Sequence, residues 1–125
     1  MTVDEYTDAA LPQYIGTALW TSPDYDDDGN ATNDLDLNYD RDDMAPEAVA
    51  SMRTDLHDFV TSNWDDVKDM EPGRCGHDFW LTRNRCGAGF WDRGLGERGD
   101  RLTANAHPYG ESNLYVGDDG RVYVD

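Results

Sequence analysis

The segment that most constrains the fold is residues 76–94, which read GHDFWLTRNRCGAGFWDRG. It holds two of the four tryptophans, and a phenylalanine precedes each of them. Its two aromatic-rich runs, residues 78–83 and 87–92, are separated by polar residues. Short aromatic runs bounded by turn residues are typical of β-strands. We therefore predict an antiparallel β-hairpin that turns within residues 84–87, with a bulge or a close backbone approach at the glycines of its second strand.

The predicted hairpin would gather polar side chains at its open end. In an antiparallel pair that turns at this point, residue 78 or 79 lies opposite residue 92. The resulting cluster would lie beside Trp80 and Trp91, and its members would be His77, Asp78, Asp92 and Arg93. Such a group could carry acid–base or phosphate chemistry, or it could be a network of salt bridges that fixes the hairpin. We expect the structural role, with catalysis by these four residues as the alternative.

Cysteine and histidine residues offer a possible zinc site. The candidate ligands are Cys75, His77, Cys86 and His107. Their types suit zinc, but their spacing matches no standard zinc finger. The hairpin would also hold Cys75 more than roughly 25 Å from Cys86, which is too far for a disulfide. It would separate Cys86 from His77 as well, so a nucleophile pair is not expected there.

The start of the acidic segment resembles a calcium-binding loop. Asp24, Asp26 and Asp28 occupy alternate positions, and Gly29 follows them as it would in such a loop. The glutamate that should complete the loop is replaced by Leu35. We therefore expect a solvated acidic loop, with calcium binding by the three aspartates as the alternative. No cofactor is expected elsewhere in the chain.

The rest of the chain predicts helices and a second hairpin. Apolar residues recur at helical spacing from about residue 7 to 21 and again from 43 to 64, where they form a stripe on one face. A third helix is expected at about residues 97–107. Beyond it, residues 113–116 and 121–124 alternate β-branched and aromatic side chains around a Gly-Asp-Asp-Gly turn. This arrangement is a strong hairpin signal.

Together these elements predict one acidic α+β domain over residues 1–125. The expected order is two helices, a β-hairpin, a helix and a second β-hairpin (α-α-β-β-α-β-β). One antiparallel sheet would pack against the helices. An Asp-rich loop at residues 23–43 would connect the first two helices.

The charge of the chain narrows its possible partners. The formal net charge is −17, from 27 acidic and 10 basic residues, and 22 of the acidic residues are aspartate. Solubility, adaptation to high salt, and mimicry of nucleic acid each explain this composition. The composition is compatible with each of these three explanations. The charge excludes binding to DNA, RNA or an anionic membrane through a basic patch, because the single lysine and scattered arginines form none.

The sequence contains no membrane or secretion signal. No apolar run approaches the roughly 18–20 residues of a transmembrane helix. The N-terminal residues are acidic, whereas a signal peptide would begin with basic residues. We expect an intracellular protein.

The mixture of aromatic and charged residues also favours a protein interface. The aromatic side chains of the central segment cannot all face one core, and aspartate and arginine surround them. We expect a binding surface made of Trp80, Arg83 and Trp91 together with Asp26, Asp27 and Asp28. A basic protein is the partner that this charge predicts.

Three motifs in this chain resemble a known family. They are GHDFWLTRN, GAGFWDRGLG and LYVGDDG, and the similarity extends over roughly residues 14–22 and 44–124. The sequence is similar to a functionally uncharacterised family of small proteins encoded by tailed bacteriophages and related viruses. The family usually has histidine where this chain has Cys86. The resemblance implies a viral accessory protein in the host cytoplasm, and it implies no reaction.

The combined expectation is a non-enzymatic viral accessory protein. It would bind and modulate a basic host protein through DNA-like acidity, with no direct binding to nucleic acid or membrane. The alternative is a small enzyme, or a metal- or nucleotide-binding protein, that uses the polar cluster at the end of the predicted hairpin.

Overall fold

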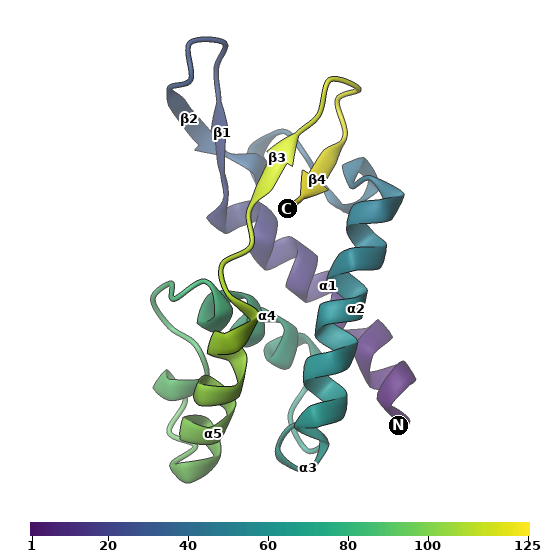
Figure 1. The fold of residues 1–125 in the computed structure, drawn as a ribbon, viewed down its shortest axis with the longest axis vertical. Helices are drawn as coiled ribbons and strands as arrows, with labels where there is room; N and C mark the ends of the chain where they lie inside the picture. Colours follow the sequence, from purple (N-terminus) through teal and green to yellow (C-terminus); the bar gives the residue numbers. More distant parts are fainter.

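A computed structural model describes residues 1–125 and shows a mixed helical and β-stranded protein. The α-helices are α1 (Val3–Thr21), α2 (Pro46–Ser62), α3 (Trp64–Val67), α4 (Pro72–Arg83) and α5 (Glu97–Ala106). The strands form two separate antiparallel pairs, β1 (Pro23–Tyr25) with β2 (Ala31–Asp34) and β3 (Leu114–Val116) with β4 (Val122–Val124). Both strand pairs lie at one end of an elongated molecule, and α3, α4 and α5 lie toward the other end (Figure 1). The α+β class agrees with the expectation, whereas the order of the elements differs.

The hairpin predicted for residues 78–92 is wrong, because its first half is helix α4. Glu71 caps this helix, and its carboxylate accepts hydrogen bonds from the backbone N–H groups of Gly73 (3.0 Å) and Arg74 (2.8 Å). Pro72 occupies the first helical position, where its missing N–H costs nothing. Residues 78–83 are all buried, so the helix has no polar face toward solvent in its second half. A helix that is buried on all sides lacks the 3.6-residue periodicity that would have identified it.

The second half of the predicted hairpin is an irregular segment with a 3₁₀ turn at Phe90–Asp92. The expected close backbone approach is confirmed at Gly89, where an added Cβ would clash with the hydroxyl of Thr82. That hydroxyl accepts a hydrogen bond from the N–H of Phe90 at 3.3 Å. The segment therefore folds back onto α4 without strand pairing.

Several predicted elements are confirmed. Helix α2 lies within residues 43–64, and its buried stripe includes Met52, Leu56 and Phe59. Helix α5 and the β3–β4 hairpin occur close to where the sequence placed them. Helix α1 begins earlier than expected, at Val3, because Thr2 and Glu5 form a capping box.

The acidic segment 23–43 is more ordered than the loop that we expected. It contains the β1–β2 hairpin and two 3₁₀ turns, Leu35–Leu37 and Arg41–Asp43. Leu35 is only 1% exposed and anchors the segment against the core. The strands of the β1–β2 hairpin are solvent-exposed except at Asp24, which is partly buried.

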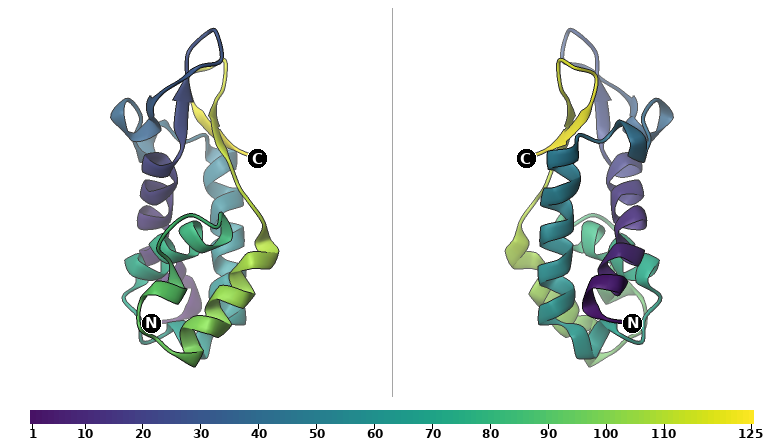
Figure 2. Two further views of the ribbon diagram at one scale, coloured as in Figure 1. Left: turned by 90° about the vertical axis from the view of Figure 1, so that its left-hand side faces the viewer. Right: turned by 90° about the vertical axis from the view of Figure 1, so that its right-hand side faces the viewer.

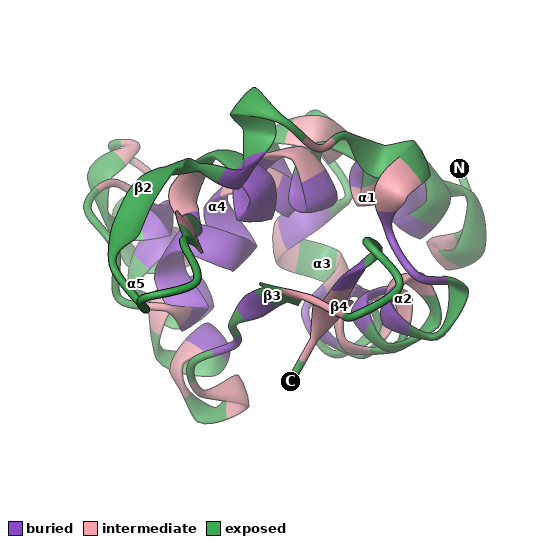
Figure 3. Cartoon of the chain, turned by 90° about the horizontal axis from the view of Figure 1, so that it is seen from above, coloured by how far each residue is buried: buried purple, intermediate pink, exposed green.

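The core lies between α1, α2 and α4, whose buried sides face one another (Figure 3). Stacked rings connect these helices, with centroids 4.2 Å apart for Phe59 and Phe79 and 5.5 Å apart for Tyr14 and Phe79. Phe90 extends the stack from the irregular segment, 5.6 Å from Phe59. The side views show α1 and α2 running along the molecule, with α4 lying across them (Figure 2). None of the helices combines the length and apolar composition needed to cross a membrane.

Candidate functional site

A buried carboxylate, Asp78, is the centre of a polar cluster on α4. Its side chain is 0% exposed and accepts two hydrogen bonds from Arg93, from Nε at 3.1 Å and from Nη2 at 2.8 Å. Hydrogen bonding to Asp78 raises the pKa of the Arg93 guanidinium above its ordinary value, against the opposing effect of desolvation. A buried aspartate paired in this two-point geometry is compensated in charge and fixed in orientation.

His77 completes the cluster from the same helix. Its Nδ1 lies 2.9 Å from Asp78 Oδ1, and the ionised carboxylate can only accept, so Nδ1 is the donor. This fixes the ring orientation, and no protein group hydrogen-bonds Nε2. The exposed Trp20 of α1 stacks near the imidazole, with ring centroids 6.5 Å apart and planes inclined by 27°.

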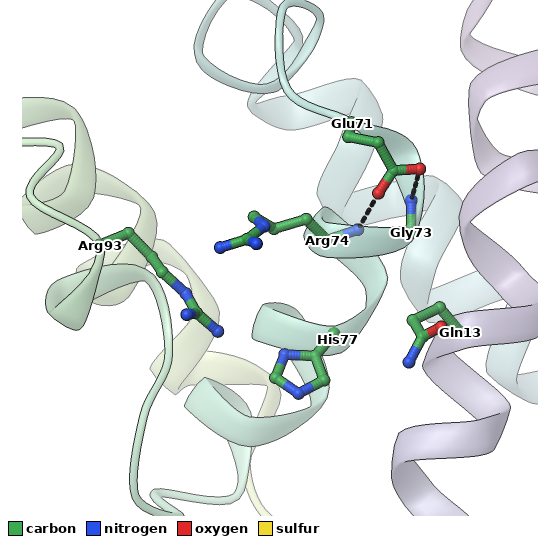
Figure 4. A pocket seen from close by; sticks show the side chains of 6 residues that line it. All are labelled: Gln13, Glu71, Gly73, Arg74, His77 and Arg93. Atoms are coloured by element: carbon green, nitrogen blue, oxygen red, sulfur yellow. Dashed lines mark hydrogen bonds between the residues drawn. The ribbon is translucent and has the colours of Figure 1, made fainter.

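Next to the cluster lies a polar pocket of about 350 Å³. It is lined by Gln13, Glu71, Gly73, Arg74, His77 and Arg93. The guanidinium groups of Arg74 and Arg93 and the ring of His77 point toward the same space (Figure 4). Glu71 is the only carboxylate in the lining, and it is used to cap α4 (Figure 4). The lining therefore carries two guanidinium groups against one carboxylate, and Asp78, which pairs with Arg93, adds a second negative charge next to it.

No protein-family model, curated protein or solved structure matches this chain. The resemblance of residues 76–94 to small viral proteins therefore stays a prediction.

Three of the four residues predicted to cluster do so, although the hairpin that was to unite them does not exist. His77 and Asp78 are neighbours on α4, and Arg93 reaches them from the irregular segment. Asp92 does not join them, because it is exposed at the end of the 3₁₀ turn. The sequence patterns did not indicate the pocket itself, which needs Arg74 one helical turn before His77. The Glu71–Pro72 pair, a helix-start signal, could have revealed that spacing.

The expected binding residues divide into buried and exposed ones. Trp80 is 2% exposed, and its indole N–H donates to Thr21 Oγ1 at 2.8 Å. Arg83 is also buried and donates to Tyr14 Oη (3.0 Å) and to Asp55 Oδ2 (2.8 Å). These two side chains hold α4 in place and do not form a surface for a partner. Trp91 is 58% exposed.

The potential metal ligands do not come together. No group of three or more histidine, cysteine, aspartate or glutamate side chains is arranged to hold a metal ion. In the predicted calcium loop, Asp26 instead accepts hydrogen bonds from the backbone N–H groups of Asp28 and Asn30, which shapes the turn. Cys75 is buried and Cys86 exposed, and both are free thiols. Their separation has a different cause from the one predicted, since Cys75 lies inside α4 and Cys86 follows it.

A second feature is the concentration of acidic residues at one end of the molecule. We call residues 24–43 and 117–121 the acidic end; it contains eleven aspartates and two arginines. The turns of the β1–β2 and β3–β4 hairpins lie at the same end of the molecule (Figures 1 and 2). None of the ion pairs in the structure involves a residue of this end. Its negative charge is therefore not neutralised within the protein.

Proposed function

We propose that this chain is a non-enzymatic viral accessory protein that acts in the host cytoplasm by binding a basic host protein through its acidic end. The observation that carries the proposal is the separation of charge. None of the aspartates of the acidic end has an ion-pair partner, whereas several aspartates elsewhere pair with arginine, as Asp8 does with Arg53 and Asp66 with Arg101. If solubility alone required the negative charge, the aspartates would not need to gather at one end of the molecule.

Exposed apolar side chains beside these carboxylates favour a protein partner. Tyr25 is 59% exposed, Leu37 65% and the neighbouring Tyr115 50%. Protein interfaces combine aromatic or aliphatic anchors with a charged rim, and the anchors supply most of the affinity. An acidic surface that served only to keep molecules apart would have no use for them.

The density of carboxylates supports the form of binding that we propose. DNA presents about one charge per 1.7 Å of its axis, and proteins that bind DNA have basic grooves that match this density. An acidic end with unpaired aspartates would compete for such a groove. Long-range attraction would accelerate association and would weaken as salt is added.

The test compares two variants that remove the same number of charges. One neutralises the acidic end (Asp26→Asn, Asp27→Asn, Asp28→Asn), and the asparagine at position 26 keeps the acceptor that shapes the turn. The control neutralises three exposed acidic residues outside it (Asp69→Asn, Glu97→Gln, Asp100→Asn). Each protein is immobilised and used to capture proteins from host extract at increasing salt, with and without duplex DNA as competitor.

We expect the native protein and the control to capture the same basic proteins. We expect the acidic-end variant to lose them, and raised salt or DNA to release them. Capture that survives both high salt and neutralisation of the acidic end would refute the electrostatic mechanism. Equal loss in both variants would show that net charge matters and its location does not.

A further inference from the structure

We propose that the pocket beside His77 is a binding site for the phosphate group of a small ligand. Arg74 and Arg93 would donate to the phosphate oxygens, and His77 and Gln13 would complete the set of polar contacts. This site lies on α1, α4 and the segment after α4, away from the acidic end. It is independent of the function proposed above.

The local charge is the first argument. The chain has 27 acidic and only 10 basic residues, yet two arginines and a histidine meet at one pocket. Arg74 makes no side-chain hydrogen bond or ion pair, although Glu71 lies only three residues away. The carboxylate of Glu71 is directed to the backbone of α4 instead, which leaves the guanidinium of Arg74 free for a ligand (Figure 4).

Preorganisation is the second argument. Asp78 holds Arg93 through Nε and Nη2, so the remaining nitrogen, Nη1, stays available. The same carboxylate holds His77 through Nδ1 and leaves Nε2 free. Side chains that are already fixed lose little conformational entropy when a ligand binds. A guanidinium with free N–H groups matches the geometry of phosphate oxygens.

The shape of the pocket indicates the ligand class. A volume of about 350 Å³ falls at the lower end of the roughly 300–1,000 Å³ typical of small-molecule sites. No hydrophobic residue lines it, so the bound part of the ligand is polar. The exposed ring of Trp20 lies beyond His77 and offers a stacking surface to a base attached to the phosphate. Free phosphate and a nucleoside monophosphate share the chemistry that the arginines recognise.

The experiment follows the ring resonances of His77 by NMR while inorganic phosphate or 5′-AMP is added at constant pH. Ionic strength is held near 0.15 M, where charges more than about 8 Å apart are largely screened, so that the net charge of the chain does not mask binding. The variant Arg74→Ala removes one proposed donor, and its fold is expected to persist because the side chain makes no internal contact by hydrogen bond or ion pair. Arg121→Ala removes an equal charge from an exposed, unpaired site at the other end and serves as the control.

We expect saturable shifts of the His77 resonances in the native protein and in the control. Arg74→Ala should weaken binding by about tenfold or more, the effect of losing a hydrogen bond between charged groups. Tighter binding of 5′-AMP than of phosphate would identify a nucleotide as the preferred source of the phosphate. The proposal is overturned if neither probe shifts His77, or if Arg74→Ala binds as well as the native protein.

Discussion

The close contact between α1 and α4 depends on the absence of a side chain at Gly76, and replacing this residue with alanine is a strong test of the structure. Gly76 lies on α4 where that helix crosses α1. A Cβ at this position would lie well inside van der Waals contact of the backbone carbonyl oxygen of Ala10 and 3.1 Å from the backbone nitrogen of Tyr14. Backbone atoms cannot move aside as a flexible side chain can. The two helices would have to separate.

The expected cost follows from two opposing effects. Overpacking a well-packed contact typically costs about 1–3 kcal/mol. Because the added Cβ would meet backbone atoms of α1, we expect a cost at the upper end of this range, about 3 kcal/mol. Alanine favours the helix over glycine by about 1 kcal/mol, which offsets part of that cost. We therefore expect Gly76→Ala to lower the free energy of unfolding by about 2 kcal/mol.

Gly16 provides the matched control, because it lies inside α1 and an added Cβ would meet nothing within 4 Å. Gly16→Ala should therefore raise the free energy of unfolding by about 0.5–1 kcal/mol, the helix-propensity gain alone. Both variants are measured by urea unfolding followed by far-UV circular dichroism, with the slope of the transition compared as a check on two-state behaviour. If Gly76→Ala stabilised the protein as much as Gly16→Ala, the packing of α1 on α4 described above would be wrong.

Three further predictions concern the buried groups and the charge. Burial raises the pKa of Cys75 to about 12. At pH values between the ordinary thiol pKa of about 8.5 and this raised pKa, the thiol keeps its proton in the folded chain and loses it in the unfolded chain. The free energy of unfolding should therefore fall as the pH rises from about 8.5 toward 12. At pH 8 iodoacetamide should accordingly modify Cys86 in the folded protein and Cys75 only after unfolding, as read by mass spectrometry; equal rates would contradict the burial of Cys75. Asp78→Ala should lower the free energy of unfolding, measured in urea, by about 3 kcal/mol. This is the low end for a broken buried ion pair, because the Arg93 side chain is 26% exposed and can rehydrate. The double variant Asp78→Ala, Arg93→Ala should lose less stability than the sum of the two single variants. Increasing KCl from 0.1 M to 1 M shortens the screening length from about 10 Å to 3 Å and should raise the melting temperature by relieving self-repulsion, whereas a flat response would argue against adaptation to salt.

The elements that the sequence predicted well are those whose local signals agree with their tertiary setting. Helix α2 has one face in the core and one in water, so its 3.6-residue stripe is visible. The β3–β4 hairpin has a turn sequence that strongly favours its geometry, with Gly120 at a positive φ of 78°. In both cases neighbouring residues alone determine the structure.

Helix α4 was misread because its setting is not local. Aromatic residues adjacent in sequence, Phe79 and Trp80, point to different parts of the core, Phe79 toward Phe59 and Trp80 toward Thr21. A strand would also place adjacent side chains on opposite sides, so the two structures share this feature of the sequence. Only the packing of α1, α2 and the irregular segment around α4 distinguishes them.

The polar cluster was predicted in composition but for an incorrect reason. Any fold that brings residues 77–78 near residue 93 unites a histidine, an aspartate and an arginine, because the intervening segment is short. The orientation of the three side chains was not predictable, since it depends on the full burial of Asp78 inside the helix packing. Arg74 and Gln13 were missed because they enter the pocket only through the helical spacing of α4 and its contact with α1.

The burial of Asp78 also determines which variants can separate function from stability. An ionised carboxylate at 0% exposure is tolerated because Arg93 and His77 bond to it, so these residues fix the segment after α4 onto the helix as well as shaping the pocket. Loss of activity on changing Asp78 or Arg93 would therefore not distinguish a damaged fold from a damaged site. Arg74 contributes to the pocket without an internal partner, and the aspartates of the acidic end lack ion pairs. Changes at Arg74 and at the acidic end are consequently the ones that report on binding alone, and because these sites lie on different parts of the molecule, each proposal can fail without the other.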